Sequence, residues 1–367
     1  MVYFFKRFFL FFISLLALFI FTFLSQNFYF SYADFNSNIV EYNGPIYHLF
    51  THCLIANPDI AFAKNNQMRT HYDNDCLTIF EFENILKELY KNNYILVKTN
   101  LIFDDTTLPA TKKKIFIPQG KKPLILSFDD VNYDRKKSGK GMVDKIALDE
   151  NKNIITYTNN STLPSYNNEF ITILENFIST HPDFSYNNAR GVICLTGYDG
   201  ILGYRTNRES PTKESEIKKV KPLIHKLKTI GWEFASHSYG HYHMKKISPE
   251  KFKDDVDKWK QEVEPLVGKT SIYVYPYGER EITHENNKIS EKHQYLEKAG
   301  FKLFCGVGIQ PFFSYINNKA NKKILFMDRT PLDGYTLKNN YKSLSHLFNI
   351  KKVYDNRRDI KLKDFYI

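Results

Sequence analysis

Short apolar runs alternate with amphipathic segments along most of the chain, and this alternation constrains the fold more than any other feature. Residues 124–128, for example, form an apolar run of strand length, whereas Thr78 and Glu81 form a capping box before apolar positions at helical spacing. About seven such strands can be counted, and strands that alternate with helices form parallel βαβ units. No glycine-rich phosphate loop follows the first strand, which argues against a dinucleotide-binding fold. The pattern predicts an α/β fold, and a closed barrel rather than an open sheet.

The N-terminus carries a targeting signal. Two basic residues precede an uncharged apolar run over residues 8–24. At about 1.5 Å per residue the run spans about 25 Å, the short limit for crossing a bilayer, and the basic flank places its first end in the cytoplasm. We predict a cytoplasmic tip at 1–7, a transmembrane signal anchor at 8–24 and a tether at 25–44, so that the protein is a single-pass cell-membrane protein with its main domain outside. A signal peptide cleaved near Ala33, which would give a secreted protein, remains an alternative.

Charge and cysteine content narrow the class of partner. The chain has 51 Lys and Arg against 40 Asp and Glu, a formal net charge of +11. This excess favours contact with anionic surfaces such as membrane lipid or cell-wall polymer. The basic residues are spread along the chain without a recognition motif, so we expect no nucleic-acid partner. None of the four cysteines forms a C-x-x-C pair, which argues against a structural zinc site, and a disulfide between Cys53 and Cys76 stays open.

Two acids stand at the end of a predicted buried strand. Asp129 and Asp130 follow the apolar run 124–128 directly. Functional groups gather at the carboxyl ends of strands in βα barrels. Neighbouring strand residues point to opposite faces, so both carboxylates reach one cavity only if the backbone turns at the strand end. The pair could then supply one metal ligand and one general base, whereas a solvated turn is the alternative.

Two histidines follow a later predicted strand, residues 232–236. His237 and His241 are four residues apart, so on a helical turn both could bind one ion through imidazole nitrogens. Ser238 stands where a zincin needs a glutamate, and the third ligand must therefore come from elsewhere. A carboxylate would complete a set of two histidines and one carboxylate. A histidine-rich loop without a metal is the alternative.

Three motifs in this order resemble those of a known family. Ser-Phe-Asp-Asp at 127–130, His-Ser-x-x-His at 237–241 and Tyr-Pro-Tyr-Gly at 275–278 are similar to the motifs of polysaccharide deacetylases. This family is carbohydrate esterase family 4, the NodB-homology domain. The resemblance covers residues 45–334 and implies a distorted (β/α)7 barrel, here preceded by one N-terminal transmembrane helix.

The resemblance also implies roles for individual residues. Asp129 would be the general base, and Asp130, His237 and His241 would bind the metal. The backbone near Tyr277 would help to hold the oxyanion. The implied cofactor is a divalent metal, Zn²⁺ first, with Co²⁺ or Ni²⁺ as alternatives.

The chain departs from the family pattern at two points. Val274 occupies the position of a usual arginine, and no Leu-x-x-His motif follows Gly278 to supply the general acid. Exported poly-N-acetylglucosamine deacetylases, which this chain resembles most closely in motif order, carry the acid histidine on an N-terminal strand. His52 resembles that acid, with a core histidine as the alternative. Arg329, after the last predicted strand, would replace the missing arginine beside Asp129, with a surface salt bridge as the alternative.

These observations predict one main domain and its function. We expect a barrel at 45–335 with an insertion at 131–190, followed by a basic C-terminal tail at 336–367. The predicted enzyme is a hydrolase of non-peptide amide bonds that removes N-acetyl groups from a cell-surface or secreted polysaccharide containing N-acetylglucosamine. Its partners would be that polymer and the membrane. A catalytically weak or inactive glycan-binding barrel at the cell surface is the alternative.

Overall fold

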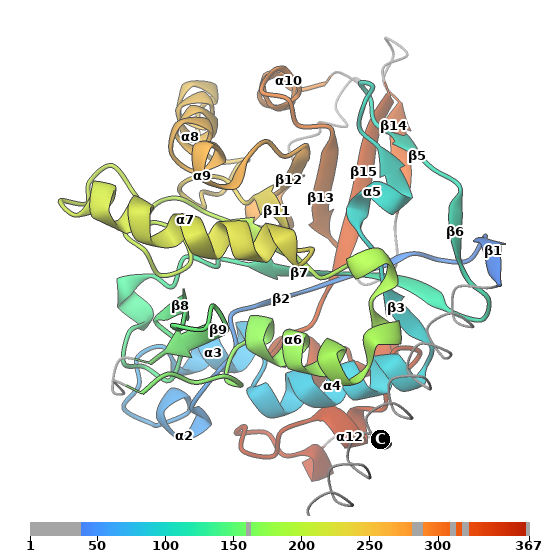
Figure 1. Ribbon diagram of the computed structural model, residues 1–367, viewed down its shortest axis with the longest axis vertical. Helices are drawn as coiled ribbons and strands as arrows, with labels where there is room; N and C mark the ends of the chain where they lie inside the picture. The colour runs from blue at the N-terminus through green and yellow to red at the C-terminus, as the bar shows by residue number, and fades with distance from the viewer. Residues whose placement is uncertain (1–37, 159–162, 281–288, 309–312, 318–322, 365–367) are drawn as a thin grey trace, which may run out of the picture.

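The computed structural model describes residues 38–158, 163–280, 289–308, 313–317 and 323–364 (Figure 1). The predicted transmembrane helix at 8–24 and most of the tether lie outside the described residues. Within the described ranges, no helix is both long enough and apolar enough to span a bilayer.

A closed ring of parallel strands forms the centre of the fold, as the sequence predicts. Each strand pairs with the next, and the pairing of β10 with β7 closes the ring. The carboxyl ends of all these strands therefore lie at one end of the barrel. In the order around the ring, the strands are β7 (Lys122–Asp129), β10 (Val192–Leu195), β11 (Glu233–Ser236), β12 (Ile272–Val274), β13 (Leu303–Val307), β15 (Lys323–Pro331) and β2 (Tyr47–His52).

The ring is distorted where two strands share one edge of β7. The first residues of β7 pair with β3 (Tyr94–Leu96), whereas Ser127 and Phe128 pair with β10. β14 (Phe313–Asn317) adds an antiparallel partner to β15. The predicted strand at 94–97 therefore exists as β3 but adjoins the ring on one side only.

Helices cover the outside of the ring (Figure 1). The capping box before α4 (Ile79–Lys91) is present, because the Thr78 hydroxyl accepts from the Glu81 N–H and the Glu81 carboxylate accepts from the Thr78 N–H. The other main helices are α6 (Phe170–Thr180), α7 (Lys213–Thr229), α8 (Pro249–Glu262) and α10 (Glu291–Lys298). Smaller elements are α2 (Pro58–Ala61), α3 (Arg69–Asp75), α5 (Thr99–Ile102), α9 (Glu264–Val267), and the pairs β1 (Ile39–Tyr42) with β6 (Ile115–Pro118), β4 (Phe103–Asp104) with β5 (Thr111–Lys112), and β8 (Lys145–Leu148) with β9 (Ile154–Tyr157).

Alternate strand residues divide the core into two layers. On β7, Leu124 and Leu126 join the layer between strands and helices, whereas Ile125 faces the barrel interior with Val192 and Leu325. By the two-residue period of a strand, Ser127 and Asp129 continue the interior face. All four cysteines are buried and unpaired in the described part of the chain, so the disulfide that the sequence left open is not formed.

The predicted basic tail at 336–367 differs from the structure. Up to residue 364 this segment is folded: it contains most of α11 (Gly334–Asn339), which contacts α3, and all of α12 (Ile350–Val353), which contacts α4. Arg358 is fully buried, and its guanidinium donates to both carboxylate oxygens of Glu81 at 2.7 Å. The number of basic residues in the segment does not indicate this fold, because the segment is held in place by buried apolar residues and a buried ion pair.

Candidate metal and catalytic site

The two acids lie at the carboxyl end of β7, and a turn directs both carboxylates to the same end of the barrel. Asp129 is the last strand residue, with 2% of its surface exposed. Asp130 has a φ of +56°, a left-handed conformation that few residues other than glycine adopt. The backbone therefore leaves the strand geometry between the two residues, as their joint use in one site requires. Such strain in a non-glycine residue is typical of functional sites.

The two histidines meet in a loop and not on a helical turn, so the prediction of a helical turn was wrong. Ser238 and His241 both have positive φ values, +60° and +51°. The Ser238 hydroxyl accepts a hydrogen bond from the His241 N–H at 2.9 Å, which closes the loop. The imidazole rings of His237 and His241 lie with centroids 4.9 Å apart.

One carboxylate and two imidazoles converge at this end of the barrel. Candidate ligand atoms of Asp130, His237 and His241 all lie within 4.8 Å of one another. The His237 Nδ1 lies 3.0 Å from the carbonyl oxygen of Val274, and because a carbonyl only accepts, Nδ1 carries the proton and Nε2 keeps its lone pair. The Oδ1 atom of Asp130 is buried and has no hydrogen-bond partner among the described residues. This donor set and the unsatisfied oxygen fit a divalent metal such as zinc.

Burial and neighbouring charges give these groups the protonation states that a metal requires. Burial raises the pKa of Asp130, but His241 and His237 outweigh it and the pKa falls to about 2. Burial is also the main reason that the pKa of His241 falls to about 4. At neutral pH the carboxylate is therefore ionised and the His241 imidazole is neutral, as metal ligands must be.

A bidentate ion pair holds Asp129. The Arg329 guanidinium donates from Nη1 to Oδ1 at 2.7 Å and from Nη2 to Oδ2 at 2.8 Å. Arg329 lies within β15 and is 1% exposed, so the pair is not a surface salt bridge. Burial raises the pKa of Asp129, but Arg329 and then His237 outweigh it and hold the pKa well below its usual range. The carboxylate stays ionised with a fixed orientation, and its Oδ2 lies 3.6 Å from the His237 Nε2.

His52 ends β2 directly beside Asp129 in the register of the sheet. Its Nδ1 lies 2.8 Å from the backbone oxygen of Asp75, so Nδ1 carries a proton and Nε2 is the atom left for chemistry. The description of a core histidine fits His48 instead, which is 2% exposed and bonded through Nε2 to the Ser127 hydroxyl at 2.9 Å.

Tyr277 lies in a short 3-10 turn after β12, with a φ of +58°. Its ring centroid is 4.6 Å from that of His241, and its ring stacks on His243 at 3.9 Å. Gly278 also has a positive φ, +65°, and a Cβ there would lie 2.8 Å from the side chain of Val307. The turn therefore needs glycine, and it brings Tyr277 against one candidate metal ligand.

The sequence interpretation missed two features of the site. Ser127 lies between His48 and Arg329, with its hydroxyl 3.1 Å from the arginine Nη1, and its place in the Ser-Phe-Asp-Asp motif could have indicated it. A cavity of about 500 Å³ also opens beside His241 and Tyr277. Its other lining residues are Lys136, Tyr198, Glu209, Tyr239, Gly240, Tyr242, Asp254, Asp255 and Lys258. They come from several separated segments of the chain, which no single sequence spacing brings together.

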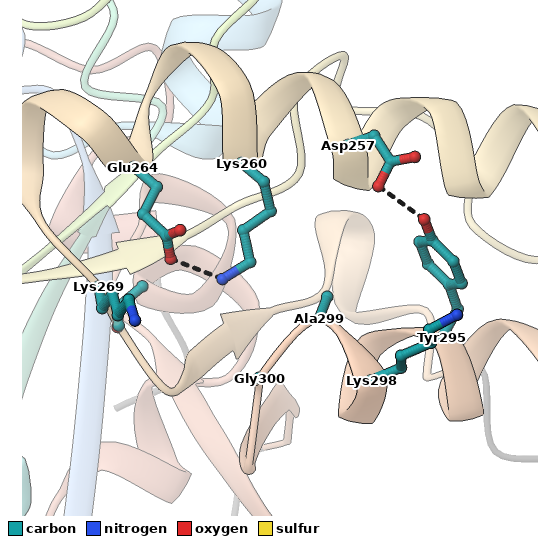
Figure 2. Close-up of a pocket in the computed structure, with 9 residues that line it drawn as sticks. Asp257, Lys260, Glu264, Lys269, Tyr295, Lys298, Ala299 and Gly300 are labelled. Carbon is teal, nitrogen blue, oxygen red and sulfur yellow. Dashed lines mark hydrogen bonds and ion pairs between the residues drawn. The ribbon is translucent and has the colours of Figure 1, made fainter.

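A second cavity, of about 420 Å³, lies at the opposite end of the barrel strands (Figure 2). It is lined by Thr270 and Gly300, which precede β12 and β13. Four of its polar residues are paired with one another, Lys260 with Glu264 at 2.6 Å and Tyr295 with Asp257 at 2.6 Å. None of the predicted site residues lines this cavity, so it is separate from the candidate site.

Comparisons with known proteins agree with the predicted resemblance. Residues 207–302 match the family model described as polysaccharide deacetylase. The matched segment includes His237, His241 and Tyr277 and begins downstream of the aspartate pair. A search of curated proteins finds no match.

Several solved structures match most of this chain at low sequence identity. The Streptococcus pyogenes deacetylase PplD in complex with acetate has 13% identity and a TM-score of 0.40, over 84% of this chain and 99% of that one. A polysaccharide deacetylase from Bacillus cereus has 13% identity and a TM-score of 0.45, over 84% and 69%. IcaB from Ammonifex degensii has 12% identity and a TM-score of 0.40, over 80% and 94%.

Proposed function

We propose that this chain, whose residues 207–302 match the polysaccharide deacetylase family model, removes N-acetyl groups from a polysaccharide containing N-acetylglucosamine. The observation that carries the proposal is the convergence of Asp130, His237 and His241 within 4.8 Å beside an ionised, oriented Asp129. This set combines a metal site with a proton acceptor, which amide hydrolysis by water needs.

Asp130, His237 and His241 would hold the metal, with zinc favoured by the ligand types. When bound, such an ion supplies Lewis acidity towards the acetamide carbonyl and the attacking water. Asp129 accepts a proton from that water, and Arg329 fixes the direction in which its carboxylate can do so.

The remaining steps fall to two other groups. The backbone N–H near Tyr277 stabilises the oxyanion that forms when water adds to the carbonyl carbon. His52 would act with both ring nitrogens protonated: held through Nδ1, it gives the Nε2 proton to the departing nitrogen as the carbon–nitrogen bond breaks and is left neutral. Acetate and a free amine on the sugar result.

Two features favour an enzyme over an inactive glycan-binding barrel. That alternative rested on a missing arginine and a missing acid histidine. Arg329 reaches Asp129 from β15, and His52 lies opposite Asp129 from β2. Arg329 and His52 are thus candidates, on other strands, for the two groups that the usual motif positions lack.

We further propose that the enzyme is exported and held at the cell membrane by residues 8–24, with the barrel outside. The first described elements enter the barrel at the end away from the candidate site. β1 and β6 lead into the amino ends of β2 and β7, whereas Asp129 and His52 lie at their carboxyl ends. A tether entering there leaves the candidate site facing away from its point of attachment.

The experiment is metal analysis and acetate release with the purified full-length protein in detergent micelles. We expect about one zinc ion per chain and acetate release from polymers of N-acetylglucosamine. Asp130→Asn should lose metal, whereas Asp129→Asn should keep the metal and lose turnover. A folded protein that binds no divalent metal would refute the proposal.

A further inference from the structure

The end of α3 holds His52 in place. The His52 Nδ1 lies 2.8 Å from the carbonyl oxygen of Asp75, the last residue of that helix. Carbonyl groups in the last turn of a helix have no partner within the helix, so this oxygen is free to accept a hydrogen bond from the imidazole. The bond fixes the tautomer and the direction of the ring and leaves Nε2 for chemistry. The position of Nε2 therefore depends on where α3 ends.

Two cations from the C-terminal segment bind that end of α3. The Lys338 Nζ donates to the carbonyl oxygen of Asp73 at 3.1 Å and also to the carboxylate of the same residue. The Arg358 guanidinium donates to the carbonyl oxygen of Asp73 at 2.8 Å and to that of Cys76 at 2.7 Å. Lysine and arginine side chains commonly bond the last carbonyls of a helix in this way. Carbonyl groups on both sides of Asp75 are thus held by a distant part of the chain.

The contact between α11 and α3 is close because a glycine begins α11. A Cβ at Gly334 would lie 2.0 Å from the carbonyl oxygen of Asp73 and 2.4 Å from the Arg358 Nη1. A larger residue at this position would push α11 away from α3. Asp333, the residue before the glycine, caps α11 with its side chain and lies near enough to His52 for the two groups to interact electrostatically. The start of α11 is therefore a direct neighbour of the proposed acid.

Burial distinguishes these two cations from the many lysines at the surface. The side chain of Lys338 is 6% exposed and that of Arg358 is fully buried. Arg358 also donates to both carboxylate oxygens of Glu81, so it holds other parts of the fold as well. The hydrogen bonds that Lys338 makes within the described ranges go to Asp73 and Asn74 at the end of α3. Lys338 is therefore the residue whose removal acts mainly on α3.

We propose that Lys338 is a positioning residue for His52, so that the C-terminal segment forms part of the working site. Lys338 holds the last turn of α3, that turn presents the carbonyl oxygen of Asp75, and this oxygen orients the imidazole. The inference deepens the proposed function, on which it rests for the role of His52 as the acid. A barrel without the C-terminal segment would keep the metal ligands and the base but would lack a correctly placed acid.

Lys338→Met tests the link by a measurement that needs no turnover. Nitrogen NMR of the imidazole rings in the full-length protein, at alkaline pH where the rings are neutral, shows which nitrogen carries the proton, and His52→Gln assigns the signals. The native ring should carry it on Nδ1, whereas Lys338→Met should give a mixture of tautomers. Lys338→Arg should restore the native state, because a guanidinium donates to the same oxygens. Lys352→Met is the matched control, since Lys352 lies in the same segment but pairs with Glu88 at 3.0 Å.

Acetate release gives a second measurement. With an N-acetylglucosamine oligomer, Lys338→Met should lower kcat about tenfold with little change in KM, since a well-placed general acid contributes about 10²–10⁴-fold and part of this is lost. With a small activated aryl acetate, whose leaving group needs no proton, the rate should stay within about twofold. In the His52→Gln background, Lys338→Met should cause no further fall, because its effect passes through His52. A merely structural role for Lys338 would lower both rates alike.

The outcomes separate this inference from the proposed function. The inference is overturned if Lys338→Met keeps the native tautomer of His52, or if it lowers the rate equally with and without His52. A changed tautomer in Lys338→Met, with no acetate release from the native protein, would leave the link standing and refute the deacetylase. Thermal unfolding shows whether each variant is folded. Should Lys338→Met not fold, Asp73→Asn weakens the same contact without a change of size and should give the same results.

Discussion

Replacing Arg329 by methionine should destabilise the protein strongly at neutral pH. The substitution leaves the Asp129 carboxylate buried, 2% exposed, without its two charge-assisted hydrogen bonds. Removing one partner of a buried ion pair costs about 3–5 kcal/mol of unfolding free energy. The guanidinium also lies 4.1 Å above the ring of Phe50, a contact that adds roughly 0.5–2 kcal/mol.

The loss should depend on pH with a defined sign. In the native protein the pKa of Asp129 is held below the unfolded value of about 3.9, so the pair stabilises the fold above that pH and less as pH falls through the folded pKa. Without Arg329, burial is the largest single influence left on the pKa of Asp129 and raises it, opposed by His237 and His52. The variant then regains stability on protonation, and its deficit relative to the native protein should shrink from pH 7 towards pH 4.

Urea denaturation of the metal-free full-length protein measures the change in unfolding free energy. A double-mutant cycle isolates the contribution of the Arg329–Asp129 pair. Asp129→Asn combined with Arg329→Met removes the stranded charge, so the double variant should be more stable than Arg329→Met alone. A cost for Arg329→Met under about 1 kcal/mol, the value of an exposed ion pair, would refute the reasoning. So would a double variant that is no more stable than the single one.

Other residues give three further predictions. His52→Gln should lower kcat while the metal content stays native, and it should abolish the alkaline limb of the pH–rate profile; an unchanged limb would exclude His52 as the acid. Because the pKa of His241 is lowered to about 4, bound metal should persist in dialysis to about pH 5, below the ordinary histidine range of about 6.5, and loss already at pH 6.5 would contradict this. Arg358→Met should lower the unfolding free energy by about 3–5 kcal/mol, measured by denaturation, with partial recovery on adding Glu81→Gln; a value near that of a surface pair would contradict the packed C-terminal segment.

The alternation of strands and helices was sufficient to predict the barrel, because its two periodicities are local properties of the sequence. The position of Asp129 and Asp130 at a strand end could be predicted for the same reason, because it depends only on the neighbouring residues. The conformation of the His237–His241 loop could not be predicted from the sequence, because a spacing of four residues suits both a helical turn and a loop with left-handed residues at Ser238 and His241. Only the packing of the loop after β11 decides between them.

The inward orientation of Arg329 could have been predicted from its position in the sequence. It follows Leu325 and Met327 at the two-residue period of β15, both of which face the barrel interior. That period would have predicted an inward guanidinium, which must be paired when buried. The identity of its partner could not be predicted, because Asp129 lies 200 residues away and the register of three strands brings the two together.

The N-terminal strand β2 connects the two halves of the candidate site. It lies between β15 and β7, so the Arg329–Asp129 pair spans the ring across β2, with Phe50 of that strand under the guanidinium. The same strand ends in His52, opposite Asp129. The orientation of the base and the position of the acid therefore depend on one strand, which is also the first barrel strand after the N-terminal segment. Closure of the ring by β2 is thus a condition for assembling the site. Displacement of this strand would separate Arg329 from Asp129 and at the same time remove His52 from the site.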